Sequence, residues 1–129
     1  MSFPDGLKYT KEHEWVLVET DTVRVGVTEY AQEQLGDVVF VELPEIGSEV
    51  CVGESFGVVE SVKTVSDVYS PVSGEVFECN GVLEGSPELI NSDPYGDGWI
   101  VKIKYSDPKE FDELLTQEEY AAFVEEESV

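Results

Sequence analysis

Short apolar runs separated by glycine or proline fill most of the chain between residues 38 and 104. Each run has the length of a strand, and we predict strands over 38–43, 48–52, 55–62, 65–69, 74–80 and 99–104. The breaks between these runs fall at Pro44, Gly47, Gly53, Pro71, Gly81 and Pro94. This spacing is typical of a small barrel or sandwich, and it argues against a parallel α/β fold.

The N-terminal part adds two strands and a short helix. Residues 9–18 and 23–27 have the apolar pattern of strands, with a turn at 20–22 between them. Thr28 is a suitable N-cap for a helix over 29–35, and Gly36 stands where helices commonly end in a left-handed residue. The helix is therefore predicted to be one or two turns long.

The hydrophobic pattern changes period after residue 106, where Asp107 and Pro108 form a helix start. A second start follows at Thr116, because Glu119 completes the spacing of a capping box. We predict a C-terminal helical segment at about 107–126 that packs on the strands. The acidic run 125–127 is predicted to be a frayed and solvated end.

The length of 129 residues and the hydrophobic content of 41% are enough for one substantial core, so we expect a single domain over 1–129. No apolar run approaches the roughly 20 residues that span a bilayer. Residues 1–6 lack the basic and apolar regions of a signal peptide. This pattern predicts a cytoplasmic protein of bacterial type, or a mitochondrial one if the chain is a processed organelle form.

Charge and cysteine content exclude several classes of function. The formal net charge is −22, from 29 acidic and 7 basic side chains, and it would repel nucleic acid and anionic membrane surfaces. Cys51 and Cys79 are too few and too far apart for a metal site. We predict that both are buried free thiols rather than partners in a disulfide.

Lys63 is the only basic residue between Arg24 and Lys102. Strand-like runs flank it on both sides, and turn glycines lie beyond them at Gly53 and Gly74. This arrangement predicts a hairpin over about 53–74 with the lysine at its tip. A lysine in that position is either an ordinary solvated side chain or one that is free to accept a modification.

Residues 57–76, with the sequence GVVESVKTVSDVYSPVSGEV, resemble the attachment hairpin of the glycine cleavage system H proteins, a family of lipoyl carriers. The resemblance extends to most of the chain, at 7–9, 13–16, 35–44, 89–91, 94–95 and 98–99. It implies a mainly β fold, a flattened β-barrel/sandwich hybrid of the lipoyl-domain type, with a short helix in the N-terminal half and C-terminal helices.

The resemblance implies that lipoate is bound to Lys63 by an amide bond and that the protein is a carrier rather than an enzyme. The implied partners are glycine decarboxylase, a tetrahydrofolate-dependent aminomethyltransferase, dihydrolipoyl dehydrogenase, and a lipoate ligase or lipoyl/octanoyl transferase. An aminomethyl group would pass from the first enzyme to the second, and electrons to the third. We expect a monomer without nucleic acid or membrane partners.

The resemblance also assigns roles to further residues. Glu60 and Ser61 are expected to contact the enzyme that attaches the arm. Glu14 and Asp67 are expected to hold the ammonium group of the loaded arm in a cleft, because a partly desolvated carboxylate attracts a cation strongly. We expect His13, the only histidine, to be structural.

Two other readings of the same residues stay open. A biotin carrier would use the same lysine, but such carriers typically have methionines on both sides of it, whereas Val62 and Thr64 stand here. An unmodified acidic β domain that binds a protein partner fits the composition equally well. It does not explain why Lys63 lies between two strand-like runs with turn glycines beyond them, nor the resemblance over most of the chain.

Overall fold

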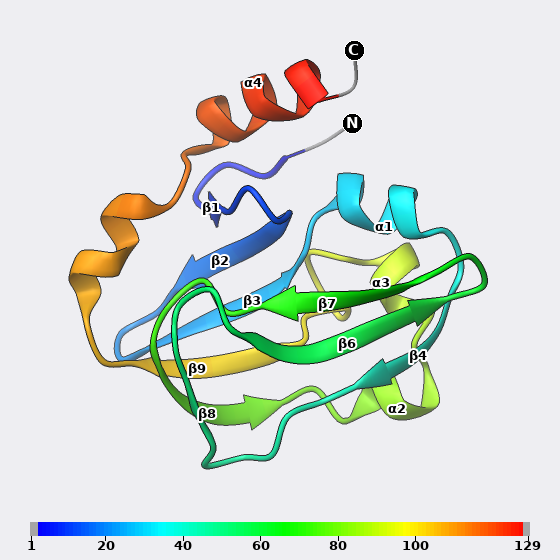
Figure 1. The fold of residues 1–129 in the computed structure, drawn as a ribbon, viewed down its shortest axis with the longest axis horizontal. Coiled ribbons are helices and arrows are strands. Elements are labelled where there is room, and N and C mark those ends of the chain that lie inside the picture. The colour runs from blue at the N-terminus through cyan, green and yellow to red at the C-terminus, as the bar shows by residue number, and fades with distance from the viewer. Residues whose placement is uncertain (1–2, 128–129) are drawn as a thin grey trace.

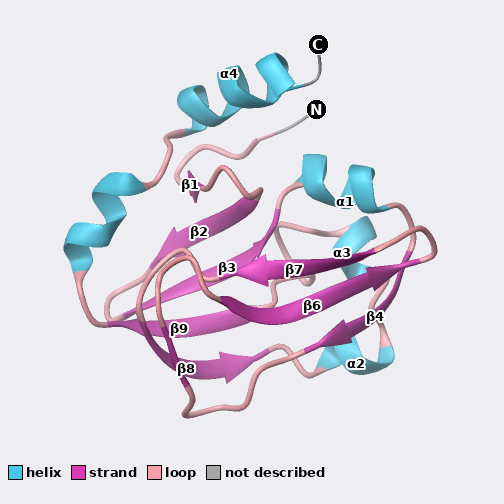
Figure 2. Ribbon diagram, viewed as in Figure 1, coloured by secondary structure: helices cyan, strands magenta, loops and turns pink. Residues whose placement is uncertain are grey.

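The computed structural model describes residues 3–127, and it consists of two antiparallel β-sheets that form a sandwich (Figures 1 and 2). The first sheet has the strand order β1 (Lys8–Tyr9), β2 (Glu14–Val18), β3 (Thr22–Val27), β9 (Val101–Tyr105), β8 (Gly74–Cys79) and β5 (Glu49–Val50). The second has the order β4 (Val38–Glu42), β6 (Ser55–Ser61) and β7 (Val65–Tyr69). The predicted mainly β class is confirmed, and within 3–127 the sheets do not close into a barrel.

The main core lies between the two sheets. Alternate residues of β3 point inward, so Val23 and Val25 are fully buried while Arg24 between them is not. Val41 and Val59 pack from the second sheet into the same cluster. Burial of such a side chain stabilises the fold by about 1.5–3 kcal/mol, so this cluster is the main force that holds the two sheets together.

In a second, aromatic cluster, the C-terminal helix α4 (Gln117–Glu127) packs against the edge of the first sheet. The rings of Tyr9 and Tyr120 are stacked, with centroids 4.7 Å apart. The backbone of Tyr9 exchanges hydrogen bonds with that of Leu115, just before the helix. In Figure 1, α4 accordingly lies beside the N-terminal segment and β1, above the sandwich.

Both predicted helix caps are present. Thr28 accepts a hydrogen bond from the Ala31 amide at the start of α1 (Glu29–Leu35), and Gly36 ends the helix with φ at +78°. Thr116 and Glu119 form a reciprocal capping box at the start of α4, with distances of 2.9 and 3.2 Å. The sequence prediction of these two helix starts is therefore confirmed.

Several predicted boundaries were wrong. The strand predicted over 9–18 is interrupted between β1 and β2, because the Thr10 hydroxyl accepts hydrogen bonds from the amides of Glu12 and Glu14 and His13 has φ at +72°. The segment after Asp107 is a 3₁₀-helix over Pro108–Glu113 rather than an α-helix. Two one-turn helices, α2 (Val82–Gly85) and α3 (Leu89–Ser92), were not predicted, since four residues are too few to show a helical period.

Two further predictions need correction. Both cysteines are free, but neither is buried: Cys79 is half-buried, and Cys51 is exposed because it follows the two-residue strand β5. Glu127 is part of α4 and lies 3.1 Å from the His13 ring, so the acidic run is not a frayed end as far as residue 127. No helix within 3–127 is long and apolar enough to cross a membrane.

Candidate functional site

Lys63 lies at the tip of the β6–β7 hairpin, which extends from the sandwich at the right of Figure 1. The ladder runs from the pair Ser55 and Tyr69 to the pair Glu60 and Val65, and a hydrogen bond of 2.8 Å from the Ser61 amide to the Thr64 carbonyl closes the turn. The Lys63 side chain is exposed. It is therefore accessible to another protein.

Ser61 organises this turn through its side chain. Its hydroxyl oxygen accepts hydrogen bonds from the amides of Lys63, at 3.2 Å, and Thr64, at 3.1 Å. The residue is only 7% exposed. A buried hydroxyl with two amide donors fixes the backbone that carries the lysine, because leaving those amides without an acceptor is costly.

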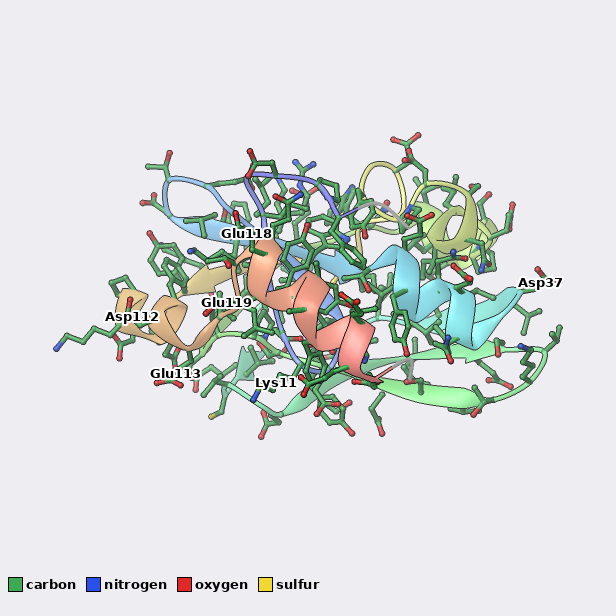
Figure 3. The ribbon with its side chains drawn as sticks, turned by 90° about the horizontal axis from the view of Figure 1, so that it is seen from above. Lys11, Asp37, Asp112, Glu113, Glu118 and Glu119 are labelled. Atoms are coloured by element: carbon green, nitrogen blue, oxygen red, sulfur yellow. The ribbon has the colours of Figure 1, made fainter. Side chains whose placement is uncertain are left out.

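The hairpin tip is also attached to the rest of the molecule. The Val62 amide donates a hydrogen bond of 3.0 Å to the carbonyl of Asp37, in the connection between α1 and β4. Figure 3 shows Asp37 at one end of the molecule, beside the loop of the hairpin. The lysine is thus presented from a backbone that is held at both the turn and the neighbouring connection.

A cleft of about 370 Å³ lies along β7, between that strand and α1. Its size is within the usual range of small-molecule sites, about 300–1,000 Å³. The strand β7 is an edge of the three-stranded sheet, so the cleft occupies the boundary between the two sheets. The lining residues come from six segments of the chain: Glu12–Glu14, Val27, Tyr30–Leu35, Val59, Thr64–Val68 and Glu127.

Glu14 is the buried carboxylate of this cleft, with 2% of the residue exposed. Its Oε1 accepts a hydrogen bond of 2.6 Å from the Thr10 hydroxyl, and its Oε2 one of 3.3 Å from the Tyr69 amide. Burial raises the pKa of Glu14 from its ordinary value of 4.5 to about 7, although the two hydrogen bonds oppose the shift. The protein thus keeps a desolvated carboxyl at a cleft wall.

No lysine, arginine or histidine within 3–127 forms an ion pair with Glu14. A buried carboxylate is usually paired, because an isolated ionised one is costly to desolvate. A cationic group that entered the cleft would supply the missing charge and favour the ionised form. The geometry therefore suits a ligand with an ammonium group.

The other predicted residues are distributed over two places. Asp67 lines the same cleft as Glu14, and its Oδ1 accepts a hydrogen bond of 3.0 Å from Ser55. Glu60 is half-buried on β6, next to Ser61, and neither of these two residues lines the cleft. The cleft roles of Glu14 and Asp67, and the enzyme contacts of Glu60 and Ser61, stay predictions.

A hydrogen-bonded chain behind the cleft was not anticipated. His13 Nδ1 lies 2.8 Å from the Tyr120 hydroxyl, which lies 2.7 Å from the hydroxyl of Thr28, the cap of α1. The other ring nitrogen of His13 lies 3.1 Å from Glu127. His13 is therefore packed among aromatic side chains, with α4 on one side and the cleft on the other. No local signal in the sequence connects residues 107 positions apart.

The chain was compared with known proteins. The family model described as glycine cleavage H-protein matches residues 7–127. A glycine cleavage system H protein from Halothermothrix orenii is 57% identical over 126 residues, 98% of each chain. One from Symbiobacterium thermophilum is 62% identical over 123 residues, 95% of this chain and 96% of the relative. A crystal structure of a glycine cleavage system H protein from Mycobacterium marinum has 39% identity and a TM-score of 0.83, covering 98% of this chain and 100% of that one.

Proposed function

The chain belongs to the glycine cleavage H-protein family, whose members carry lipoyl groups, and we propose that it shuttles an aminomethyl group on a lipoyl arm amide-linked to Lys63. The group would be taken from glycine decarboxylase and delivered to the tetrahydrofolate-dependent aminomethyltransferase. Electrons would then pass to dihydrolipoyl dehydrogenase. The observation that carries the proposal is a buried carboxylate, with no cationic partner among residues 3–127, in a cleft beside the hairpin of an exposed lysine.

The residues present fit a lipoyl group. Lys63 offers an exposed amine on a fixed turn, and the cleft offers space of small-molecule size next to the same hairpin. When attached, the dithiolane of the group supplies the acceptor and redox chemistry. The protein supplies attachment, position and shelter.

We assign Glu14 to binding the aminomethyl group, which is the cargo of the lipoyl arm. An aminomethyl group bonded to sulfur carries an ammonium head, and its carbon is open to attack by water. A carboxylate that is 2% exposed can hold that head by a charge-assisted hydrogen bond in surroundings from which water is excluded. Apolar lining residues such as Val59 and Val68 keep water from the bonds that must not break. Asp67 adds a second negative charge on the cleft wall.

Attachment of the arm requires a lipoate ligase or a lipoyl/octanoyl transferase, and we assign Glu60 and Ser61 to that encounter. Glu60 is accessible on the strand that leads to the tip, whereas Ser61 sets the backbone of the turn. Substitution Glu60→Lys reverses one charge beside the lysine. The rate of lipoylation should fall, and an unchanged rate would remove Glu60 from the proposal.

The remaining assignments follow from the carrier role. The chain acts as one carrier domain in the cytoplasm, as a monomer, and as a shared substrate of its partners rather than as an enzyme. A shuttle has to leave each partner after every transfer, which a monomer with a single exposed attachment lysine does readily.

The first experiment is the mass of the intact protein after incubation with lipoate and a lipoate ligase, followed by peptide mapping over residue 63. The expected result is one lipoyl group on Lys63. Lys63→Arg keeps the positive charge but removes the amine that forms the amide. The free energy of unfolding of this variant should lie within about 0.5 kcal/mol of the wild-type value. The variant should support no glycine decarboxylation.

The alternative readings give different outcomes in the same experiment. A biotin group on Lys63 in the presence of a biotin ligase would indicate a biotin carrier. An unmodified chain after exposure to active ligases, or glycine decarboxylation that survives in Lys63→Arg, would instead indicate an acidic domain that only binds a protein partner.

A further inference from the structure

Lys63 does not extend straight into solvent from the hairpin tip but lies against Gly36. A Cβ atom placed on Gly36 would be 3.2 Å from Cε of Lys63, 3.5 Å from Cδ and 3.7 Å from Nζ. Contacts near 3.2 Å are tighter than most real Cβ contacts, so the lysine stem occupies the space that a side chain at position 36 would need. The stem and the glycine are therefore complementary in shape.

We propose that Gly36 is a positioning residue that directs the arm from Lys63 into the cleft, an inference that rests on the proposed function. Gln34 and Leu35, immediately before Gly36, line the cleft on the side of α1. Thr64, immediately after Lys63, lines it on the other side. A lysine stem that crosses the face of Gly36 therefore starts the arm between Gly36 and the hairpin tip. We call this space the passage.

Both sides of this passage are fixed by backbone hydrogen bonds. The Gly36 amide donates to the Gln32 carbonyl at 3.0 Å, and its own carbonyl accepts from the Asn91 side chain at 2.8 Å. The hairpin is tied to the next residue by the bond from Val62 to Asp37. These hydrogen bonds hold the end of α1 and the hairpin in place. The width of the passage therefore depends on the absence of a side chain at position 36.

A methyl group at position 36 would therefore act on the lysine. The flexible stem is the part that yields, and it has to move away from Gly36. An arm that starts outside the passage spends less time in the cleft, and its cargo meets more water. The rate of hydrolysis rises in proportion to the fraction of time that the cargo spends outside the cleft.

Gly36→Ala also strains the backbone, because φ at +78° is unfavourable for alanine. The chain offers a matched control in Gly47, which has φ at +92° and has nothing within 4 Å of a Cβ placed on it. Gly47→Ala introduces comparable strain without contact to the arm. A difference between the two variants isolates the effect of the methyl group on Lys63.

The first test needs no lipoyl group, and its wild-type part needs no variant. In the unmodified wild type, the Hα atoms of Gly36 and the ε-methylene protons of Lys63 should give nuclear Overhauser cross-peaks. In Gly36→Ala the ε-methylene protons should lose their contacts with residue 36, while Gly47→Ala should keep the wild-type pattern. A wild-type spectrum in which the Lys63 methylenes show no contact with Gly36 would overturn the inference.

The second test uses lipoylated protein loaded with the aminomethyl group and kept apart from the partner enzymes. Water breaks the bonds of the cargo carbon, leaving a thiol on the arm and releasing formaldehyde and ammonium, with no change in oxidation state. We expect the first-order release rate to rise roughly tenfold in Gly36→Ala, which corresponds to a shift of about 1.4 kcal/mol in the equilibrium between the docked and the free arm, and to stay at the wild-type value in Gly47→Ala. The rate of lipoylation of the unmodified chain should not fall, because Lys63 becomes more exposed.

The outcomes separate this inference from the function on which it rests. If wild-type Lys63 is not lipoylated at all, the proposed function fails and the inference with it. If lipoylation proceeds and the two alanine variants release the cargo at equal rates, the carrier function stands and the role of Gly36 is overturned.

Discussion

The hairpin tip and the cleft are neighbours that are built in opposite ways. The tip is made within four residues, by hydrogen bonds from Lys63 and Thr64 to the Ser61 hydroxyl. The cleft is made by segments from Glu12 to Glu127, so nearly the whole described chain must fold before it exists. In the function that we propose, attachment of the arm thus depends on a local structure, and protection of the cargo depends on a long-range one.

The two regions should therefore respond differently to substitutions. A change at the tip should alter how the arm is attached and leave the cleft intact. A change at the cleft wall or behind it should alter how the cargo is protected and leave attachment intact. Variants in the two regions test that separation.

Glu14→Gln should raise the rate at which the loaded carrier loses its cargo to water. A charge-assisted hydrogen bond is worth about 1.5–3 kcal/mol, which corresponds to roughly a tenfold to hundredfold increase in that rate. The measurement is formaldehyde release from loaded protein at pH 8, where the wild-type carboxyl is mostly ionised given its pKa of about 7.

Glu12→Gln is the control for this prediction, because Glu12 lines the same cleft but is exposed. Its release rate should change little, and lipoylation of both variants should match the wild type. Slow lipoylation of Glu14→Gln would show that tip and cleft are not separable.

The pH dependence of stability should reveal the buried Glu14. Its pKa is raised from 4.5 to about 7 in the folded state, so the folded protein binds this proton more tightly than the unfolded chain does. The resulting stabilisation is fully present below pH 4.5 and is lost as the pH rises through 7. Between pH 5 and 8, the wild type should lose about 2 kcal/mol more than Glu14→Gln in urea unfolding. Parallel losses in the two proteins would contradict the raised pKa.

Tyr120→Phe should weaken the support behind the cleft. The change removes the hydroxyl that contacts His13 and Thr28, and the expected loss of unfolding free energy is about 1–2 kcal/mol. Release of cargo should rise by a smaller factor than in Glu14→Gln, while lipoylation is unchanged. Tyr105→Phe is the matched control, since its hydroxyl bonds to the Thr20 carbonyl on an exposed surface. Equal release rates in the two variants would show that α4 does not support the cleft.

Ser61→Ala should have the smallest effect and the opposite pattern. Loss of the acceptor for two turn amides should cost about 1 kcal/mol and slow lipoylation, because the lysine is held less firmly. Release of cargo from the loaded form should not change, because the hydrogen bond from Val62 to Asp37 still holds the hairpin beside Gly36. Ser48→Ala removes a hydroxyl from a different turn and should affect neither rate. A faster release in Ser61→Ala alone would mean that the tip also shapes the cleft.

The same contrast explains what the sequence could predict. The hairpin, the cap at Thr28, the end of α1 at Gly36 and the capping box at Thr116 all follow from residues within a few positions of each other, and the structure contains each of them. The break after Tyr9 was missed because it depends on the Thr10 side chain turning the backbone, which a pattern of apolar residues does not show.

The cleft could be predicted only in part. The resemblance pointed to Glu14 and Asp67, but nothing in the sequence shows that Glu14 is almost completely buried while Asp67 is exposed. The contact of His13 with Tyr120 spans 107 positions, and the acidic run around Glu127 has the composition of a solvated end. Burial and contacts of this kind arise only when distant segments pack together. They cannot be predicted from local sequence patterns.

The position of β7 at the edge of its sheet has a further consequence, for the behaviour of the protein in concentrated solution. An edge strand is a template on which a strand of another molecule can pair, and such pairing is a common route to aggregation. Here the exposed carboxylate of Asp67 stands in the middle of the strand, and a net charge of −22 repels any second copy that approaches it. The acidity of the chain thereby opposes strand pairing at β7, the edge along which the proposed arm would move.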